Sequence, residues 1–595
     1  MPYVSVLFFI TLLTHLFSPR IESMSMYTFE NEYSGAPYDD LLSIYMQSFR
    51  DNFSLPALTD YVSGKTLTYG ALAQRIARLH LFYELCGVRP GDKIALLGKN
   101  TPTWVVTFMA TVTYGAVIVP VLHDFSPTDA TNIINHSDAV MLFVSEPIFS
   151  HLDFEQMPNL RAVVSVETRK VIAERGAVSH LAIVKSLTRR FRRRYPSGFG
   201  PDNIEYRHFD GSSTAVINYT SGTTGFSKGV MLSLDNLRGN VVFGIRSRLH
   251  YQGSRALSFL PLAHAYGCAF DMLVPLAVGT HVTLFGKVPT PTLLVKAMNQ
   301  VRPSLIICVP LILEKIYRKM IVPMISKPSV RWVLAVPMLD KAIYTLIRSK
   351  LVDAFGGAFE EVIVGGAPLN PEVEEFLYRI KFPFTVGYGM TECAPLISYT
   401  PWRRFRPGSS GRVLKGIMEA KILADDTKPA TADGKRQGEI MVRGLNVMKG
   451  YYKNPDATGA VLEEDGWLHT GDMGTIGEPD NRTIYIRGRY KTMILTANGQ
   501  NIYPEEIEAK LNNMPFVSEC LVVDRNGHLF ALVYPDADEV EAHRLSGGQL
   551  AEAMESNRVE LNSLVAPYER IEGIEIMQEE FAKTPKRSIR RFLYK

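Results

Sequence analysis

The sequence predicts an α/β protein with a large N-terminal domain, in which parallel-type sheets are flanked by helices, and a small α+β C-terminal domain. Its 595 residues are too many for one hydrophobic core, so at least two domains are expected. From residue 67 onward, helical patterns alternate with short apolar segments that are typical of buried strands. Such alternation predicts parallel sheets with helices packed against them.

The first elements of the N-terminal domain are the clearest. Apolar side chains in Tyr69–Leu85 recur with the period of a helix. Three apolar runs follow as expected strands, at Lys93–Leu97, 116–122 and Ala139–Val144. We therefore expect these runs to be strands of a parallel sheet with the helix against it.

The composition changes past Arg443, where Gly, Asp and other turn-forming residues become frequent. A βα-like pattern follows at 483–511, and the short joint at 489–491 is our candidate domain boundary. The rest of the chain, roughly one hundred residues, is enough for a small α+β domain. The predicted division is 1–25, 26–489 and 490–595.

The first segment contains an apolar run, 4–17 (VSVLFFITLLTHLF), about as long as the core of a signal peptide and too short to span a bilayer comfortably. No basic leader precedes it. Three interpretations compete: a weak membrane anchor, a secretory signal, or an over-extended start upstream of the real one. Met24 and Met26, which precede a polar segment, favour the last.

The charged and sulfur-containing residues exclude several classes of protein. The formal net charge is only +4, with both signs interspersed, so no basic nucleic-acid footprint is present. The five cysteines are odd in number, scattered and without a C-x-x-C pair, which argues against a disulfide framework or a zinc site. A reducing, cytoplasmic compartment is favoured.

Two segments are candidate surfaces for membrane contact. Residues 185–194 (KSLTRRFRRR) are strongly basic, and a solvated face is the ordinary interpretation of such a run. Attraction to anionic lipid is the alternative. The segment 331–355 mixes apolar and basic residues in a helix-like pattern, for which core packing is the simpler explanation.

The most specific local pattern is 219–229 (YTSGTTGFSKG), which follows the strand-like 215–218. Glycines allow backbone N–H groups to approach an anion, hydroxyls add donors, and Lys228 adds a positive charge, so the segment suits a polyphosphate. It is not a Walker A loop, because Gly225 is followed by Phe226 and Ser227 rather than by Lys and Ser or Thr.

This segment resembles the phosphate-binding signature of the adenylate-forming, or AMP-binding, superfamily, and the resemblance extends from about Thr66 to the C-terminus. Within the superfamily, 388–399 (YGMTECAPLISY) resembles bacterial-type long-chain fatty acid:CoA ligases more than firefly-type luciferases. The resemblance implies that ATP phosphates are bound by Thr220, Ser221, Gly222, Thr223, Thr224, Gly225 and Lys228.

Two further motifs resemble parts of the superfamily's ligand site. His264, in 260–267 (LPLAHAYG), matches a residue that lines the acid-binding pocket, although a lone His beside apolar residues is more often part of the core. The run 362–369 (VIVGGAPL) is a strand that ends in small residues, where an open α/β sheet usually forms its ligand crevice. The resemblance places Gly366, Ala367 and Pro368 against adenine.

The motif 387–392 (GYGMTE) carries the catalytic and metal candidates. By resemblance, Gly387, Tyr388 and Gly389 contact adenine, with the Tyr388 ring stacked on it. Thr391 then touches the α-phosphate or acyl carbonyl, and Glu392 holds Mg²⁺. The chemistry agrees, because Mg²⁺ usually takes one or two carboxylates together with substrate phosphates.

The last N-terminal motifs concern ribose and the hinge. By resemblance, Asp472 in 466–472 (GWLHTGD) accepts hydrogen bonds from both ribose hydroxyls, and Arg489 meets ribose or phosphate. Lys491 occupies the hinge about which the small, mobile domain turns, and 498–508 (NGQNIYPEEIE) lies near the thiol tunnel. A simple helix start at Pro504 and Glu505 also explains the last motif.

The resemblance implies that 26–489 binds the acid and ATP and forms acyl-AMP, and that the thiol of CoA then replaces AMP. The C-terminal lysine of the superfamily has no direct match here. An ungapped alignment of 583–591 (KTPKRSIRR) puts Ser588 at its position, Lys583 is near, and a two-residue shift offers Lys586, which we favour as the catalytic lysine.

Long-chain fatty acid:CoA ligation is thus the leading hypothesis, with the fatty acid, ATP and CoA as substrates and Mg²⁺ as metal. One alternative transfers the acyl group to carrier-protein phosphopantetheine, whose thiol is chemically identical. The other alternative is a nonenzymatic protein that binds nucleotide or acyl chains at a membrane. The altered lysine motif and the apolar N-terminus motivate it.

Overall fold

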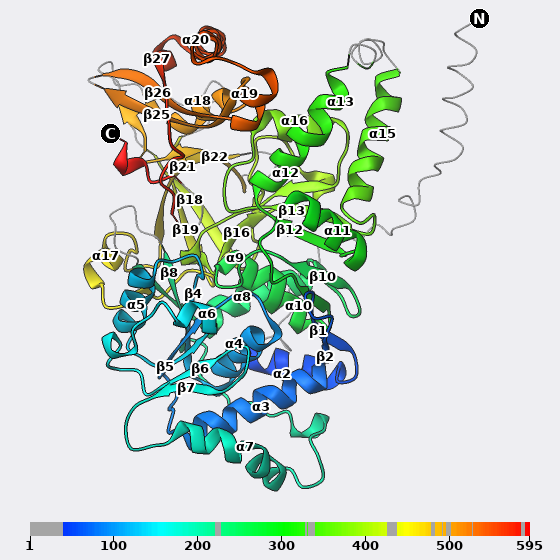
Figure 1. Ribbon diagram of the computed structural model, residues 1–595, viewed down its shortest axis with the longest axis vertical. Coiled ribbons are helices and arrows are strands. Elements are labelled where there is room, and N and C mark those ends of the chain that lie inside the picture. The colour runs from blue at the N-terminus through cyan, green and yellow to red at the C-terminus, as the bar shows by residue number, and fades with distance from the viewer. Residues whose placement is uncertain are drawn as a thin grey trace, which may run out of the picture.

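The computed structural model describes residues 40–220, 228–327, 330, 339–424, 437–477, 482–490, 492–495, 501–525, 527–584 and 589–594. The C-terminal domain lies at one end of the molecule, above several sheets of the N-terminal domain and their helices (Figure 1). Among the described residues, the structure contains no helix that is both long and apolar enough to span a bilayer. The apolar run 4–17 lies outside the described residues.

The N-terminal half is built on an eight-stranded sheet of order β20-β9-β8-β4-β3-β5-β6-β7. The strands from β8 to β6 are parallel, whereas β7, β9 and β20 pair antiparallel with their neighbours. The strands are β3 (Lys93–Leu97), β4 (Val117–Val121), β5 (Ala139–Val144), β6 (Ala162–Ser165), β7 (Val171–Glu174), β8 (Thr214–Thr220), β9 (Lys228–Ser233) and β20 (Gly450–Tyr451).

Helices cover both faces of this sheet because alternate side chains of its strands point in opposite directions. In β3, Ile94 and Leu96 join the largest core cluster, whereas Ala95 and Leu97 join a second cluster on the other face. The helices of this region are α2 (Leu41–Asp51), α3 (Tyr69–Leu85), α4 (Pro102–Tyr114), α5 (Pro127–His136), α6 (Glu146–Phe149) and α7 (His180–Arg194).

These elements confirm the α/β class that the alternation of patterns predicts. The predicted helix Tyr69–Leu85 and the strands Lys93–Leu97 and Ala139–Val144 have the predicted bounds, and the run 116–122 contains Val117–Val121. Thr68 caps the helix, since its side chain accepts the N–H of Ala71. The local signals therefore agree with the tertiary fold.

Two smaller sheets continue the N-terminal domain, in the orders β10-β11-β1-β2 and β12-β13-β14. The second is parallel, as predicted. The strands are β1 (Pro56–Asp60), β2 (Thr66–Thr68), β10 (Arg255–Ser258), β11 (His281–Leu284), β12 (Leu305–Cys308), β13 (Glu361–Val364) and β14 (Phe384–Val386). The helices are α8 (Leu234–Arg246), α9 (Ala265–Cys268), α10 (Val274–Ala277), α11 (Pro291–Val301), α12 (Pro310–Ile316), α13 (Val322–Ile325), α15 (Leu339–Ala354) and α16 (Pro371–Arg379).

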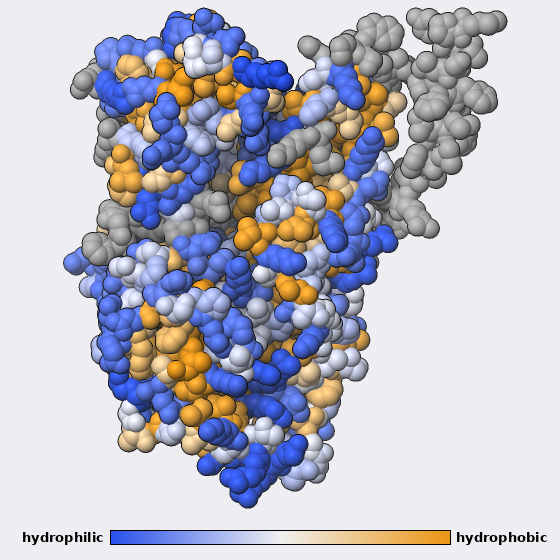
Figure 2. Space-filling model, viewed as in Figure 1, coloured by the Kyte–Doolittle hydropathy of each residue, from blue (hydrophilic) through white to orange (hydrophobic). Residues whose placement is uncertain are grey.

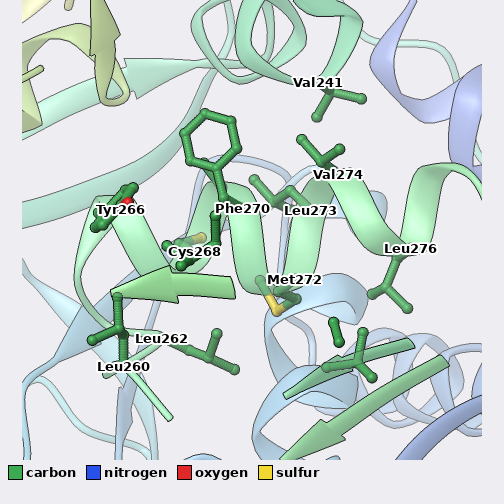
Figure 3. Packing of buried hydrophobic residues seen from close by; sticks show 14 of the residues in the cluster. Val241, Leu260, Leu262, Tyr266, Cys268, Phe270, Met272, Leu273, Val274 and Leu276 are labelled. Carbon is green, nitrogen blue, oxygen red and sulfur yellow. The ribbon is translucent and has the colours of Figure 1, made fainter. Parts of the chain in front are cut away.

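The segment from α9 to α10 shows how tightly this core is packed. Cys268, Phe270, Leu273 and Val274 are buried and belong to the largest hydrophobic cluster (Figure 3). Burial of apolar side chains supplies the main stabilisation of such a segment. The segment that follows His264 is therefore fixed by the core.

A seven-stranded antiparallel sheet, of order β15-β16-β17-β22-β21-β19-β18, was not part of the predicted arrangement of parallel-type sheets. It forms where Gly and turn signals allow the chain to reverse between neighbouring strands. Its strands are β15 (Tyr388–Gly389), β16 (Leu396–Tyr399), β17 (Arg412–Val413), β18 (Met418–Ala424), β19 (Gly438–Gly444), β21 (Leu468–Gly477) and β22 (Thr483–Arg489); the helix α17 (Pro455–Gly459) lies between β20 and β21 in the chain.

The C-terminal domain has its own hydrophobic clusters, formed from Ile494 onward. The predicted boundary at 489–491 remains a prediction, and Lys491 lies outside the described residues. The elements are β23 (Ile494–Leu495), β24 (Asn501–Ile502), α18 (Pro504–Leu511), β25 (Val517–Arg525), β26 (His528–Pro535), α19 (Ala537–His543), α20 (Gly547–Leu564) and β27 (Ile571–Ile576).

Candidate active site

A cleft of about 3940 Å³ separates the C-terminal domain from the ends of the N-terminal strands. The surface is hollowed below the C-terminal domain (Figure 2). The cleft brings together every predicted site residue that the structure describes. These residues are Thr220, Lys228, His264, Gly366, Ala367, Pro368, Gly387, Tyr388, Gly389, Thr391, Glu392, Asp472 and Arg489.

The predicted phosphate loop joins β8 to β9, which pair antiparallel. Thr220 and Lys228 stand opposite each other in this register, so they close the base of the loop. Ser221, Gly222, Thr223, Thr224 and Gly225 lie outside the described residues. The Nζ of Lys228 lies 4.7 Å from the ring centroid of Tyr451, which keeps the ammonium at the edge of the cleft.

Tyr388, Asp472 and Arg489 form one polar group on the antiparallel sheet. The hydroxyl of Tyr388 donates to Oδ2 of Asp472 over 2.7 Å. Asp472 and Arg489 are paired across β21 and β22, and Oδ1 of Asp472 lies 3.3 Å from Nε of Arg489. Burial raises the pKa of the Asp472 carboxyl, although the charge of Arg489 and the hydrogen bond from Tyr388 oppose that rise.

This arrangement supplies a hydrogen-bond acceptor of fixed orientation to a cleft. Asp472 is only 8% exposed, whereas the side chain of Arg489 is 69% exposed and free to reach a ligand. Each carboxylate oxygen can accept more than one hydrogen bond. Asp472 can therefore keep its protein partners and still accept from a ligand hydroxyl, as its predicted role requires.

Glu392 also lines the cleft, from the short 3₁₀ turn Thr391–Cys393. Its Oε1 accepts a hydrogen bond of 2.9 Å from the hydroxyl of Tyr451, while Oε2 contacts no donor among the described residues. Burial and the neighbouring Glu392 raise the pKa of Tyr451, so its hydroxyl stays a donor. One oxygen of Glu392 is thus oriented by Tyr451, and the other can accept a ligand.

This donor set fits Mg²⁺, which uses one or two carboxylates and otherwise takes oxygens of substrate phosphates and water. In the described part of the chain, no group of three or more His, Cys, Asp or Glu side chains could hold a metal ion by itself. A metal held mainly by a substrate needs no such group. Glu392 in the same cleft as Thr220 and Lys228, which flank the predicted phosphate loop, is the arrangement that this chemistry needs.

Two glycines allow the backbone to pass close to the cleft. Gly389 has the carbonyl oxygen of Pro395 only 2.3 Å from where a Cβ would lie, so a side chain would not fit there. Gly366, after β13, has φ +88°, a left-handed conformation that favours glycine. The small residues at these strand ends thus have a steric reason as well as a predicted role.

His264 lies half-buried at the start of α9, where its Nδ1 accepts the N–H of Tyr266 over 3.2 Å. Two contacts fix this segment: Asn218 of β8 donates to the carbonyl of Ala263, and the hydroxyl of Tyr266 donates to the carbonyl of Ile363. The imidazole therefore lines the cleft from a rigid position.

One side of the cleft is apolar. Side chains of α11 and α12, and of the residue that precedes α12, line it over a continuous part of the wall. They are Leu294, Met298, Val309, Ile312 and Ile316. An apolar wall beside a polar centre suits a ligand that has a polar head and a hydrocarbon part.

Of the candidate lysines, Lys586 lies outside the described residues, whereas Lys583 is held within the C-terminal domain. The Nζ of Lys583 lies 2.7 Å from Oε1 of Glu519 and forms a second ion pair with Glu580. Burial acts to lower the pKa of Lys583, but the hydrogen bonds to these carboxylates outweigh it and raise that pKa. Lys583 pairs with Ile589 as an antiparallel bridge, and residues 585–588 lie outside the described residues.

Several residues that shape the site carried no motif signal. Tyr451 orients Glu392, and Glu439 accepts hydrogen bonds from His469 and from the N–H of Gly471, next to Asp472. These contacts join strands far apart in the sequence. The position of Gly450 and Tyr451 shortly after β19 could have suggested the strand β20. It gave no indication that β20 pairs with β9.

The domains also touch beside the cleft. Asn370, which caps α16, exchanges two hydrogen bonds with Asn513, of 2.7 and 2.9 Å. Arg318 donates to the carbonyls of Asn512 and Val517. Neither contact was predicted from the sequence, because isolated polar residues give no periodic signal.

A family model described as AMP-binding enzyme matches residues 48–452. The chain belongs to the AMP-binding enzyme family. This confirms the resemblance that the motifs indicate. The matched segment contains the phosphate loop, the 387–392 motif and Tyr451, although it ends before Asp472 and Arg489.

Three relatives show what this AMP-binding enzyme is similar to. It is 30% identical over 530 residues to peroxisomal long chain acyl-CoA synthetase 6 of Arabidopsis thaliana, covering 83% of this chain and 72% of the relative. It is 28% identical over 542 residues to the chloroplastic long-chain-fatty-acid–[acyl-carrier-protein] ligase AEE15 of the same plant, covering 80% and 73%. The structure resembles O-succinylbenzoate coenzyme A synthetase of Bacillus subtilis in complex with ATP and a magnesium ion, with TM-score 0.68, 21% identity and coverage of 92% and 98%. The last likeness concerns the fold.

Proposed function

We propose that this protein is an ATP-dependent ligase that converts a long-chain fatty acid to its acyl-CoA. The observation that carries the proposal is the meeting of Lys228, Glu392 and the Tyr388–Asp472 pair in one cleft of an AMP-binding enzyme. A similar long chain acyl-CoA synthetase and the apolar wall of the cleft support a fatty acid as the substrate.

In the first step, a carboxylate oxygen of the fatty acid attacks the α-phosphorus of ATP, and the bond to pyrophosphate breaks. The products are acyl-AMP and pyrophosphate. Lys228 and the hydroxyls of the phosphate loop would lie near the phosphates and offset their negative charge, which otherwise repels the carboxylate. Asp472 and Arg489 would hold the ribose, so that the α-phosphate is fixed relative to the acid.

Glu392 is the residue that would hold Mg²⁺, and Tyr451 keeps its carboxylate oriented. When bound, Mg²⁺ supplies positive charge to the phosphate oxygens. Thr391, buried beside Glu392, would contact the α-phosphate or the acyl carbonyl. His264 would form part of the wall against which the acid lies.

In the second step, the sulfur of CoA attacks the acyl carbonyl, the bond to AMP breaks and the thiol proton is lost to solvent. Lys586 is the lysine that we assign to the first step. Lys583 is already held by Glu519 and Glu580, which supports Lys586 over Lys583. Lys491 is our candidate for the hinge between the two steps.

The experiment that tests the function incubates the purified protein with MgATP, CoA and fatty acids of graded chain length, and detects products by mass. We expect acyl-CoA, AMP and pyrophosphate, with the highest yield for long chains. Omission of CoA should leave acyl-AMP. No product with any acid, while ATP still binds, would contradict the proposal and favour a protein that only binds nucleotide.

Carrier-protein phosphopantetheine is the second candidate acceptor, because a carrier-protein ligase is among the similar proteins. The same assay with holo-acyl carrier protein in place of CoA distinguishes the two. Acyl-AMP that is consumed by carrier protein but not by CoA would establish this alternative.

A further inference from the structure

The helix α7 lies at the end of the molecule opposite the C-terminal domain (Figure 1). Its inner face is apolar: Phe191 is buried in the core, and Ile183, Val184 and Leu187 pack against it. The guanidinium of Arg78 lies 4.8 Å from the centroid of the Phe191 ring. The helix is thus fixed to the domain by one face.

The outer face of α7 is basic. The helix exposes six basic side chains, of which Arg190 donates to the hydroxyl of Ser186. Four of the six, which we name the α7 surface, are Lys185, Arg189, Arg192 and Arg193. The helix contains no acidic residue. Within the described parts of the chain, no carboxylate forms an ion pair with these four side chains, whereas the neighbouring Arg194 pairs with Glu84 over 2.7 Å. Hydrophilic side chains gather at this end of the molecule (Figure 2).

Further positive charges lie close to the helix on the side of α3. Arg78 packs on Phe191, as described, and Arg75 lies one turn earlier on α3. Burial lowers the pKa of Arg75, and the charges of Arg169 and Arg78 lower it further. Like charges that crowd together repel one another unless an anion lies near them. This crowding is a cost that an anionic partner would remove.

We propose that the α7 surface docks the protein on an anionic lipid bilayer. Its charge is complementary to lipid phosphates, and guanidinium groups bind phosphate oxygens in pairs. Two exposed apolar residues at the start of the helix, Val178 and Leu181, are 47% and 39% exposed and can enter the headgroup region. Basic residues near an anionic membrane surface each add to the attraction.

The position of α7 favours a bilayer over an acyl carrier protein. A carrier protein would need to bring its phosphopantetheine to the cleft, which lies beside the C-terminal domain, whereas α7 lies at the other end of the molecule (Figure 1). The net charge of +4 also provides no broad footprint for nucleic acid. Docking does not depend on ligase activity. If the proposed function holds, docking places the enzyme where long-chain fatty acids partition.

The test measures binding of the full chain to sedimented vesicles of phosphatidylcholine, and to vesicles in which about one lipid in three is phosphatidylglycerol. We expect stronger binding to the anionic vesicles, and a loss of the difference at high salt. A variant with Lys185→Gln, Arg189→Gln, Arg192→Gln and Arg193→Gln should bind anionic vesicles at least roughly tenfold more weakly than the unaltered protein. Its activity on detergent-dispersed substrate should stay unchanged.

The matched control removes four exposed basic side chains that are scattered over other surfaces: Lys65→Gln, Arg255→Gln, Lys296→Gln and Lys415→Gln. It has the same net charge as the α7 variant and should bind vesicles nearly as well as the unaltered protein. Circular dichroism of both variants checks that they are folded.

Three outcomes would overturn the proposal. If the unaltered protein bound anionic and neutral vesicles equally, there would be no electrostatic docking. If the α7 variant and the control variant lost vesicle binding equally, the effect would come from net charge alone. If the α7 variant kept vesicle binding but lost affinity for holo-acyl carrier protein, the α7 surface would belong to a protein partner.

Discussion

The hydroxyl of Tyr388 donates a hydrogen bond of 2.7 Å to Oδ2 of Asp472, which lies 84 positions later in the chain. Arg489 approaches the other oxygen of the same carboxylate. Asp472 is therefore oriented by two partners before any ligand binds, and such preorganisation lowers the entropic cost of binding.

Removal of the Tyr388 hydroxyl should weaken ATP binding. In Tyr388→Phe the ring remains, but Asp472 loses one partner, so we expect KM for ATP to rise about threefold to tenfold with kcat little changed. Tyr61→Phe is the matched control, since it removes a tyrosine hydrogen bond to Gln300 at the surface. Pyrophosphate release at varied ATP measures both. An unchanged KM in Tyr388→Phe would contradict a ribose role for Asp472.

Glu392→Gln should impair the metal-dependent step. The neutral amide keeps the shape and the contact with Tyr451 but loses the charge that attracts Mg²⁺, so acyl-AMP formation should slow about a hundredfold. The half-saturating Mg²⁺ concentration should also rise. Glu419→Gln, which removes an exposed partner of Arg443, is the control. If the Mg²⁺ dependence of Glu392→Gln equals that of the unaltered protein, Glu392 is not the metal ligand.

The two C-terminal lysines should differ in their effects. Lys586→Gln should slow acyl-AMP formation about a hundredfold to a thousandfold, because a preorganised charge is lost. The transfer of a prepared acyl-AMP to CoA should be unaffected. Lys583→Gln should instead leave both steps within severalfold and lower the stability of the C-terminal domain, since it leaves Glu519 and Glu580 without their cation. Full activity in both variants would show that neither lysine acts.

The strand β21, which carries His469 and Asp472, should lose stability as the pH rises. His469 donates to Glu439 over 2.9 Å and to Glu463 over 3.2 Å, and the hydrogen bond to Glu439 is the main cause that raises its pKa above 6.5. The folded state therefore binds a proton more tightly than the unfolded state. The contribution of protonated His469 to the free energy of unfolding is complete below pH 6.5. It is lost as the pH rises through the raised pKa.

Urea unfolding at a series of pH values measures this effect. Above pH 6.5, the free energy of unfolding should fall more steeply with pH in the unaltered protein than in His469→Gln. His151→Gln, a change on another surface of the N-terminal domain, should leave the slope as it is. Equal slopes in all three proteins would show that the pKa of His469 is the same in the folded and unfolded states.

Bulk added at Val309 should change the preference for chain length. Val309 lines the apolar side of the cleft, and its Cγ1 lies 3.8 Å from where a Cβ on Gly366 would be. Val309→Trp should therefore shorten the preferred fatty acid. Competition between a short and a long acid, detected by mass, measures the preference. The same preference in both proteins would place the hydrocarbon chain elsewhere.

The sequence by itself determined the α/β class, the bounds of elements such as Lys93–Leu97, and the motifs whose described residues meet in the cleft. These features follow from local signals. Side-chain periodicity specifies a strand or helix, and the loops after parallel strands meet at one edge of their sheet. The order of the motifs therefore fixed which residues could gather there.

Only the tertiary structure decided how those residues contact one another. The antiparallel sheet sets Asp472 opposite Arg489, β20 brings Tyr451 to Glu392, and Glu519 holds Lys583. Strand partners and ion pairs of this kind join segments far apart in the chain. Their choice depends on how the whole core packs and on which register buries the apolar face, and no local pattern contains that information.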